Sequence, residues 1–507
     1  MQLSHYGRQV IYTSEKEVTK ENIADILRKA MQVHEQNASD IKKLLEYDAG
    51  KQEKTREKKY RPDIDNWCVD NVASEISSFW LSYGWSNPVT LSMRTKNDDA
   101  NKEIADGIFE LNKFYDILGN KSKNQELAQY VVKAGVGYTF TDINTDYEIG
   151  DAPFTLDVLD ALCTFVVRST YYLDKRVVMA GTYFCDTDGH KVYTCYTNTT
   201  RYDLNHLYEH LEYSGEANPL GMIPITEWFR SHDRMGVFER QLSEMDNLNL
   251  LISDFTNDVD QNTQCVWLTT DLEFPTEIVI KEDGTEEEVT KKPKNGDWVQ
   301  GYTSRDGKTP TAKPLAVDYD YTGMLNNIMA RRALILQKCN VPCRNDNSGG
   351  STGVAMSDAT GWTQAETEAS RQDQLKDVFK MNEVKLVLRA IDKCPGFPMD
   401  NPVRKLHYSD VEPNITRQKT YELTTKVNAM CALIAKGFSL EDTLSIAPMF
   451  EDNNQVVVRS GEGVRKYQET QVFKDTTTEN TEEKRPFPDY SDQISNSPNI
   501  DGMNTEN

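Results

Sequence analysis

A short histidine and glutamate motif is the first candidate for chemistry in this chain. His206, Glu209 and His210 match the pattern H-x-x-E-H. On a helix, this spacing would place both imidazoles on one side to hold zinc and would leave the carboxylate to activate water. However, turn-forming residues flank the motif at 198–200 and 218–219, and no third ligand is apparent. A zinc metallopeptidase is therefore the alternative function, and a chance match is favoured over it.

Two other motifs also fall short of a reactive site. Cys339 and Cys343 could share a metal, but the second pair that a zinc site requires is missing. The glycine-rich run at 348–353 does not follow the G-x-x-x-x-G-K-[ST] pattern of a phosphate-binding loop. No catalytic triad, kinase set or dinucleotide fingerprint is found. We therefore predict no enzyme, with no catalytic residue, no cofactor and no metal.

Composition and charge narrow the class of protein. The chain has 507 residues and a net charge of −23, and its nine cysteines are scattered, as is typical of free thiols in a reducing cytoplasm. No apolar run reaches the roughly 18 residues that span a bilayer, so no membrane association is predicted. The acidity argues against tight static binding of nucleic acid, whose affinity comes mainly from Lys and Arg. The acidity does not argue against a weak contact with DNA that slides along the protein surface.

The segment 218–260 organises the elements around these candidates. An apolar run at 222–225 predicts a short strand, and Pro224 restricts it to an edge or a strand start. A long amphipathic helix follows, whose apolar residues recur every three or four positions. They are Leu242, Met245, Leu248, Ile252, Phe255 and Val259. The other faces are strongly acidic, so we expect this helix to stand beside copies of itself.

The rest of the chain predicts an α+β fold. Helical patterns cover 16–50, 64–84, 101–118, 363–394, 416–436 and 440–447, and alternating patterns predict strands at 137–140, 164–167, 177–180, 191–196 and 404–408. A small β insertion at 263–318 separates the acidic helix from a second helix that begins near 319. The basic run at 51–61 predicts a solvated linker or, as the alternative, an electrostatic contact with an acidic neighbour, subunit or nucleic acid.

Several ordered segments together resemble a known family. These are Gly221-Met222-Ile223-Pro224-Ile225, the run from Asp233 to Glu239, the helix residues Asp246, Asn249, Ser253, Asp254 and Asn257, and the run Ser351-Thr352-Gly353-Val354-Ala355-Met356. In their order and spacing they resemble the portal proteins of tailed double-stranded DNA bacteriophages, of the long-tailed type. The resemblance covers most of residues 16–450.

The resemblance implies a dodecameric ring at one capsid vertex and a division of the chain into parts. These parts are an N-terminal arm (1–15), a wing (16–235), a first stem helix (236–262), a clip (263–318), a second stem helix (319–340), a tunnel loop (341–362), a long linking helix with a wing return (363–413) and a crown (414–456). Residues 457–507 are predicted to be a disordered acidic tail.

Function, partners and site residues also follow from the resemblance. It implies genome packaging with the terminase large subunit, DNA retention and ejection, and contacts with the major capsid and scaffolding proteins and a head-completion adaptor. The implied location is the virion, after synthesis in the host cytoplasm. An acidic scaffold or adaptor without a channel is a further alternative. The tunnel-loop residues would be Ser351, Thr352, Gly353, Val354, Ala355 and Met356. The channel-facing stem candidates are Glu239, Asp246, Asp254, Asp258, Asp260, Arg331 and Arg332.

Overall fold

The computed structural model describes most of the chain in two separate units. The described residues are 3–57, 62–94, 101–263, 267–270, 276–280, 286–290, 311–314, 320–342, 361–417, 423–440, 443–444, 456–457 and 460–466. The first unit is Met1–Gln418 and the second is Lys419–Asn507. The second unit contains α9 (Leu423–Ala435), which ends just before Gly437, a residue with a φ of +91°.

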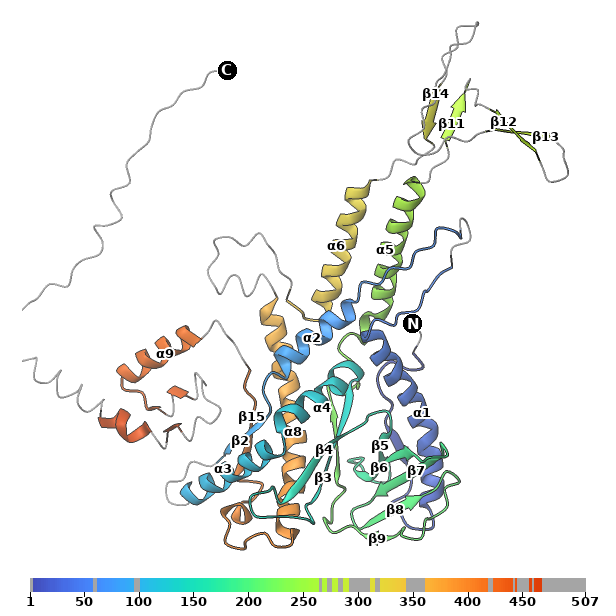
Figure 1. Cartoon of the computed structure of the whole chain (residues 1–507). Helices are drawn as coiled ribbons and strands as arrows, with labels where there is room; N and C mark the ends of the chain where they lie inside the picture. The colour runs from blue at the N-terminus through green and yellow to red at the C-terminus, as the bar shows by residue number, and fades with distance from the viewer. Residues whose placement is uncertain are drawn as a thin grey trace, which may run out of the picture. The chain divides into compact units, whose positions relative to one another are not determined.

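A six-stranded sheet forms one half of the first unit (Figure 1). Its order is β1 (Ile11–Thr13), β5 (Thr164–Ser169), β6 (Val177–Cys185), β7 (Lys191–Tyr196), β8 (Thr200–Leu204) and β9 (Glu216–Ala217). β1 pairs parallel with β5, and the other neighbours are antiparallel. The helix α1 (Ile23–Asp48) packs against this sheet through buried residues that include Ile23, Leu27 and Met31.

A three-stranded sheet lies at the centre of the unit, in the order β10 (Ile225–Phe229), β3 (Val136–Ile143) and β4 (Phe154–Leu159). Both α4 (Asn120–Ala134) and α8 (Trp362–Lys393) contact β3. Gly137 permits the close approach of α4, because a Cβ at this position would lie 2.8 Å from Leu127 Cδ1. The next residue, Tyr138, points to the opposite face of the strand and joins a separate core cluster with Ile41 and Val166.

A smaller layer completes this unit. The helix α3 (Asn101–Ile117) packs on β2 (Thr90–Met93) and on η2 (Pro402–Lys405), and β2 pairs antiparallel with β15 (Val411–Asn414). Buried side chains of α3 and the later turns of α8, such as Leu111, Val384 and Val387, share one core cluster. α2 (Val72–Gly84) packs against α1, α4 and α6.

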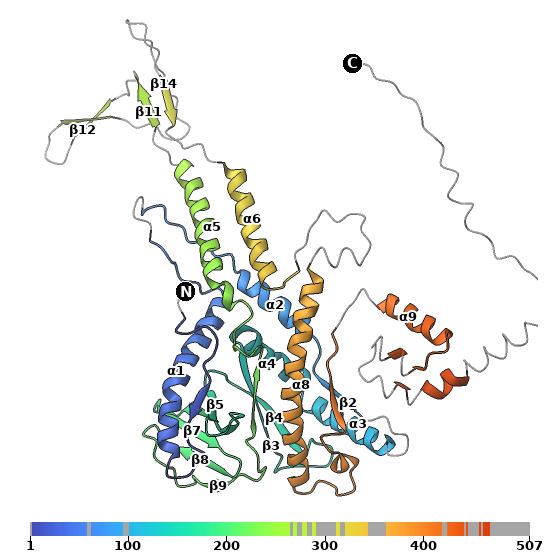
Figure 2. The same cartoon turned by 180° about the vertical axis from the view of Figure 1, so that it is seen from behind.

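Two long helices, α5 (Leu242–Thr263) and α6 (Tyr321–Lys338), lie side by side (Figure 2). A 3-10 turn, η1 (Glu239–Gln241), leads into α5. Between the two helices in sequence, β11 (Trp267–Thr270) pairs antiparallel with β14 (Thr311–Pro314), and β12 (Thr276–Ile280) with β13 (Glu286–Thr290). The apolar seam of α5 is buried at Leu242, Met245 and Leu248, whereas Val259 is 41% exposed.

These elements confirm the expected mixture of helix and sheet, including the four predicted strands between 137 and 196 and the long helix at 363–394. Asp188-Gly189 forms the β6–β7 turn, where Gly189 has a φ of +80°. In the described part of the chain, no helix is long and apolar enough to cross a membrane. The tail at 457–507 was predicted to be disordered, but residues 460–466 of it form a helix; the residues after 466 lie outside the described part of the chain.

Four local predictions were wrong in position or type. The strand predicted at 222–225 begins only at Ile225, directly after Pro224, which cannot donate to a ladder. The helix predicted from 16 begins at Ile23. The helix predicted from 64 begins at Val72, because the backbone before it hydrogen-bonds to α5. Residues 404–408 form no strand; the 3-10 turn η2 occupies Pro402–Lys405, and the strand follows at β15.

α8 carries a lysine whose environment is nearly closed to water. Lys376 Nζ donates to the Gly84 carbonyl oxygen (2.5 Å) and lies 4.3 Å from the ring centroid of Trp85. Burial lowers the pKa of Lys376 from its usual 10.5 to about 7, and the charge of Asp377 offsets only part of this effect. Between pH 7 and 10.5 the unfolded chain therefore binds more protons at Lys376 than the folded chain does, so stability rises with pH in this window.

Replacing Lys376 with Met should remove this dependence. We expect the free energy of unfolding of the wild type to increase between pH 7 and 9.5 relative to the variant, by up to about 1.4 kcal/mol per pH unit. Thermal unfolding followed by circular dichroism over this range measures the difference. Lys113→Met is the matched control, because Lys113 is exposed and paired only with Glu110 among the described residues. Parallel pH profiles for wild type and Lys376→Met would contradict the prediction.

Candidate functional site

The α5–α6 pair and the segment that lies along α5 form the candidate site. Residues 62–71, here called the strap, run without regular secondary structure beside α5. Backbone N–H groups of alternate strap residues donate to side chains one helical turn apart: Asn66 to Asn257 Oδ1 (2.7 Å), Cys68 to Ser253 Oγ (2.9 Å) and Asp70 to Asn249 Oδ1 (2.9 Å). The spacings match because two extended residues span about 6.6 Å and four helical residues about 6.0 Å.

The three receiving side chains are buried, so this ladder is part of the core of the helix pair. Asn249 also donates from Nδ2 to Gln52 Oε1 (2.5 Å), and Gln52 in turn donates to the Tyr47 carbonyl and to Asn71 Oδ1. A buried polar network of this kind fixes one arrangement of the groups it joins, because each group that loses its partner is left unsatisfied. The ladder therefore fixes the position of α5 against α1 and α2.

The carboxylates of α5 are largely engaged with this same chain. Asp254 pairs with Arg56 (2.5 Å), and Asp260 accepts from Asn66 Nδ2 (2.5 Å). Asp246 accepts from the Tyr47 hydroxyl (2.8 Å); burial, together with the charge of Asp246, raises the pKa of Tyr47 and keeps the phenol protonated. Arg56 of the basic run thus pairs with a carboxylate of its own chain, whereas the alternative prediction for this run was a contact with an acidic neighbour such as a subunit or nucleic acid.

Glu239 is not a surface residue, so its prediction as a channel-facing group was wrong. Its side chain is 0% exposed and pairs with Arg8 Nη2 (2.7 Å), a residue of the N-terminal arm. The backbone N–H groups of Gly7 (2.6 Å) and Gly236 (2.8 Å) donate to the two oxygens of the same carboxylate. Glu239 therefore joins the arm to the start of α5.

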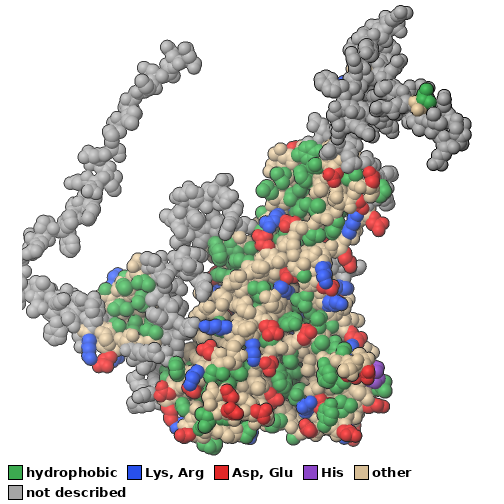
Figure 3. All heavy atoms as spheres, viewed as in Figure 1, with side chains coloured by type: hydrophobic (Ala, Val, Ile, Leu, Met, Phe, Trp, Pro, Cys, Tyr) green, Lys and Arg blue, Asp and Glu red, His purple; other side chains and the backbone are tan. Residues whose placement is uncertain are grey.

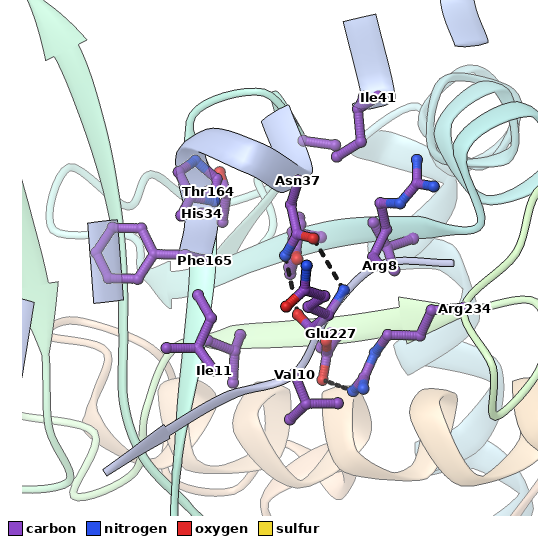
Figure 4. Close-up of a pocket in the computed structure, with 15 residues that line it drawn as sticks. Arg8, Val10, Ile11, His34, Asn37, Ile41, Thr164, Phe165, Glu227 and Arg234 are labelled. Carbon is purple, nitrogen blue, oxygen red and sulfur yellow. Dashed lines mark hydrogen bonds and ion pairs between the residues drawn. The ribbon is translucent and has the colours of Figure 1, made fainter. Parts of the chain in front are cut away.

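The arm lies in a groove that Figure 4 shows in close-up, with Arg8, Val10 and Ile11 among the labelled residues. Asn37 of α1 accepts from the Gln9 backbone N–H (2.8 Å) and donates to the Gln9 carbonyl oxygen (2.9 Å). On the far side of the groove, Arg234 pairs with Glu227 (3.0 Å). The groove is filled by the chain's own N-terminal arm, and its cavity of about 10 Å³ has the size of a single water.

α6 is the more exposed helix of the pair. Arg332 pairs with Asp70 (3.0 Å) and Glu75, so it joins α6 to the strap and α2, and Arg331 lies 3.7 Å from Glu244 of α5. Three apolar side chains of α6 are exposed, Leu325, Met329 and Leu334. Figure 3 shows hydrophobic side chains on the outer surface of this helix pair, with acidic and basic groups interspersed.

The remaining predicted site residues are placed as follows. Asp258 is half-buried on α5. The tunnel-loop candidates Ser351, Thr352, Gly353, Val354, Ala355 and Met356 lie outside the described residues, as does Cys343. Cys339 is buried, and burial raises the pKa of its thiol to about 12, so it remains protonated.

The zinc arrangement predicted as the alternative does not form. Residues 206–210 adopt a turn instead of a helix, with Tyr208 at a φ of +66°. Both ring nitrogens of His210 have other partners, Ser214 Oγ (2.8 Å) and the Lys20 carbonyl oxygen (2.9 Å). His206 stacks on His190, with ring centroids 4.2 Å apart. The residues of the motif therefore serve as turn and packing groups.

Sequence reasoning missed two structural features of this region. The first feature is the set of strap acceptors, Asn249, Ser253 and Asn257. They recur every four residues as short polar side chains on one side of α5, so the sequence contains a signal for them. The pairing of Arg8 with Glu239 has no local signal, because 231 positions separate the two residues.

A family model described as "Phage portal protein, SPP1 Gp6-like" matches residues 27–482. This range contains the strap, the α5–α6 pair, the strands between them and α8. No curated protein matches the chain.

Proposed function

The chain belongs to the family of SPP1 Gp6-like phage portal proteins, and from this membership we propose that it forms the ring-shaped DNA channel at one vertex of the capsid. Portal proteins are structural, non-enzymatic components of the phage capsid. The observation that carries the proposal is the helix pair α5–α6 with short strands inserted between its two helices, inside the matched range.

We assign the parts of the chain to the parts of such a ring. α5 and α6 would be the stem, 263–318 the clip, 341–362 the tunnel loop, and 414–456 the crown. The sheets, with α1 to α4, would form the wing, and α8 would connect the tunnel loop with the wing return. In this assignment the terminase large subunit docks during packaging, and a head-completion adaptor takes its place afterwards. Major capsid and scaffolding proteins would contact the wing.

The exposed apolar side chains of the helix pair support an assembly of several copies. Leu325 and Met329 are one helical turn apart on α6 and are 47% and 62% exposed, and Val259 on α5 is 41% exposed. Burial of such side chains against a neighbouring copy removes apolar area from water at about 25 cal/mol per Å². A head-to-tail contact of this kind closes into a ring when its rotation is a simple fraction of a full turn.

The charge of the chain supports passage of DNA without tight binding. A channel rich in Lys and Arg would release counterions from DNA and hold it, whereas an acidic wall repels phosphates. Arg331 and Arg332 already have carboxylate partners, Glu244 for the first and Asp70 and Glu75 for the second. The positive charge of each of these two arginines is therefore offset by carboxylates of the same chain.

Negative-stain electron microscopy of the full-length protein tests the proposal. We expect rings with a central hole. The double variant Leu325→Asp with Met329→Asp should raise the dissociation constant of the assembly at least about tenfold, because it places charges in the proposed contact between neighbouring copies. Asn327→Asp, at an exposed position on the side of the same helix away from Leu325 and Met329, is the matched control. A strict monomer at all concentrations and salt conditions would refute a ring, and assemblies without a hole would favour the scaffold or adaptor alternative.

A further inference from the structure

An open hollow of about 340 Å³ lies between the segment that follows β10 and the first half of α8. α8 and β10 are in contact. The wall includes three arginines, Arg230, Arg240 and Arg371. The other lining residues are Ser231, His232, Asp233, Gln374 and Leu375. Three guanidinium groups around one hollow stand out in a chain with a net charge of −23.

The acidic groups at this hollow already have their hydrogen-bond donors. Glu368 accepts from Arg230 Nη2 (2.8 Å), Arg371 Nη2 (3.0 Å) and Gln372 Nε2 (3.1 Å). Asp233 accepts from the Ser231 hydroxyl and from the Arg240 guanidinium. Two carboxylates therefore face three guanidinium groups, which leaves one formal positive charge in excess.

Two of the guanidinium groups, those of Arg240 and Arg371, have N–H donors that are not used in hydrogen bonds within the described residues. Each guanidinium has five N–H donors. Within the described residues, Arg371 donates only to Glu368, and Arg240 only to Asp233 and to Met235 Sδ. Their side chains are 65% and 69% exposed, so the remaining N–H groups are accessible. His232 adds an exposed ring whose nitrogens have no hydrogen-bond partner in the part of the chain that the structure describes.

Arg230 differs from the other two arginines because it is held in place. Its side chain is largely buried (13% exposed), pairs with Glu368 and lies 5.9 Å from the ring centroid of Trp80. Its backbone N–H donates to the Gly135 carbonyl oxygen (3.1 Å). The hollow thus has one fixed cation in its wall and two cations with spare donors at its opening.

We propose that this hollow binds a phosphate group, either as free phosphate or as a phosphodiester of nucleic acid, through Arg240 and Arg371, with Arg230 as the fixed cation. Planar guanidinium groups suit phosphate oxygens because they can donate two parallel hydrogen bonds. A free phosphate, which carries nearly two negative charges at pH 7.5, gains more from several nearby cations than a singly charged carboxylate does. A phosphodiester carries one charge and would rely on the paired guanidinium hydrogen bonds. The hollow exceeds the volume of one phosphate ion, so a phosphate attached to a larger group also fits.

The site lies within a single chain, so the proposal does not depend on a ring or a channel. The test therefore uses the full-length protein in whatever assembly it forms. Isothermal titration with sodium phosphate at pH 7.5 and low ionic strength should give binding in the wild type. Arg240→Gln with Arg371→Gln should weaken the affinity at least tenfold, which corresponds to about 1.4 kcal/mol.

Arg28→Gln with Arg176→Gln is the matched control, because both residues are exposed arginines paired with a nearby aspartate outside the hollow. This control should leave the phosphate affinity unchanged. The single variant Arg371→Gln keeps the test valid if the double variant does not fold, since Arg371 lies at the surface. Equal phosphate affinity in the wild type and in the folded Arg371 variants, or no binding by the wild type, would overturn the proposal.

A second titration distinguishes the two sources of phosphate. A fluorescein-labelled DNA duplex of about 20 base pairs is added at the same ionic strength, with and without phosphate, because such contacts depend on salt. Competition between duplex and phosphate that is lost in Arg240→Gln with Arg371→Gln identifies a phosphodiester site. Phosphate binding without competition identifies a site for free phosphate.

Discussion

Replacement of Arg8 with Met should lower the free energy of unfolding by about 3–5 kcal/mol, the usual cost of removing one partner from a buried ion pair. Glu239 is 0% exposed, and without Arg8 its charge would keep only the N–H groups of Gly7 and Gly236 as donors. Urea unfolding followed by tryptophan fluorescence measures the loss. The size of the effect comes from the carboxylate left behind, not from the apolar surface of the new side chain.

The double variant Arg8→Met with Glu239→Gln is the control for this interpretation. Since it removes both charges, we expect it to recover much of the stability that the single variant loses. If both variants lose the same amount, the ion pair is not the source of the effect.

The pH dependence of Arg8→Met provides a second check. Burial raises the pKa of Glu239 above its ordinary value, although the charge of Arg8 and the Gly7 and Gly236 amides act in the opposite direction. Without Arg8 the pKa should rise further, so the folded variant takes up a proton on Glu239 at a higher pH than the unfolded chain does. The deficit of Arg8→Met relative to the wild type should therefore shrink between pH 7 and pH 5.

Replacement of Asn249 with Leu should release the strap from α5 and cost about 2–6 kcal/mol. The change leaves the Asp70 N–H and the Gln52 side chain without their partner in a buried site, at about 1–3 kcal/mol for each unsatisfied group. Hydrogen exchange read by mass spectrometry should show faster exchange at the amides of Asn66, Cys68 and Asp70. Urea unfolding gives the change in free energy.

Asn247→Leu is the matched control for the strap, because Asn247 lies on the same helix but is exposed. It should leave both exchange and stability close to those of the wild type. Unchanged exchange of the strap amides in Asn249→Leu would show that the ladder does not hold this segment.

Elements defined by their own local pattern could be predicted from the sequence. The apolar residues of α8 and the alternation in β3, β5, β6 and β7 act within a few positions, so their periods are visible without knowledge of the partner. The repeat of Leu242, Met245 and Leu248 likewise indicates the buried side of α5, and these residues are buried. The mixed helix and sheet class follows from these periods.

The parts that depend on distant contacts could not be predicted. Residues 64–71 have apolar residues at helical spacing, yet their N–H groups donate to side chains about 180–190 positions away on α5. Glu239 was assigned to a surface because it begins an acidic helix, whereas Arg8 lies 231 positions before it in the chain. Carboxylates on one helix look alike in sequence, and only the partners from other elements distinguish a buried one from an exposed one.

The apolar seam of α5 changes from full burial at Leu248 to 41% exposure at Val259. Local unfolding free energies follow the density of buried contacts, so they should decrease along α5 from its first turn to its last. Molecules that bind near the last turns would then act on the part of the helix that opens most readily. Part of their binding energy would be used to order that end of the helix. The hydrogen bonds between the strap and α5 would limit how far local unfolding spreads from the last turns of α5 toward the sheets.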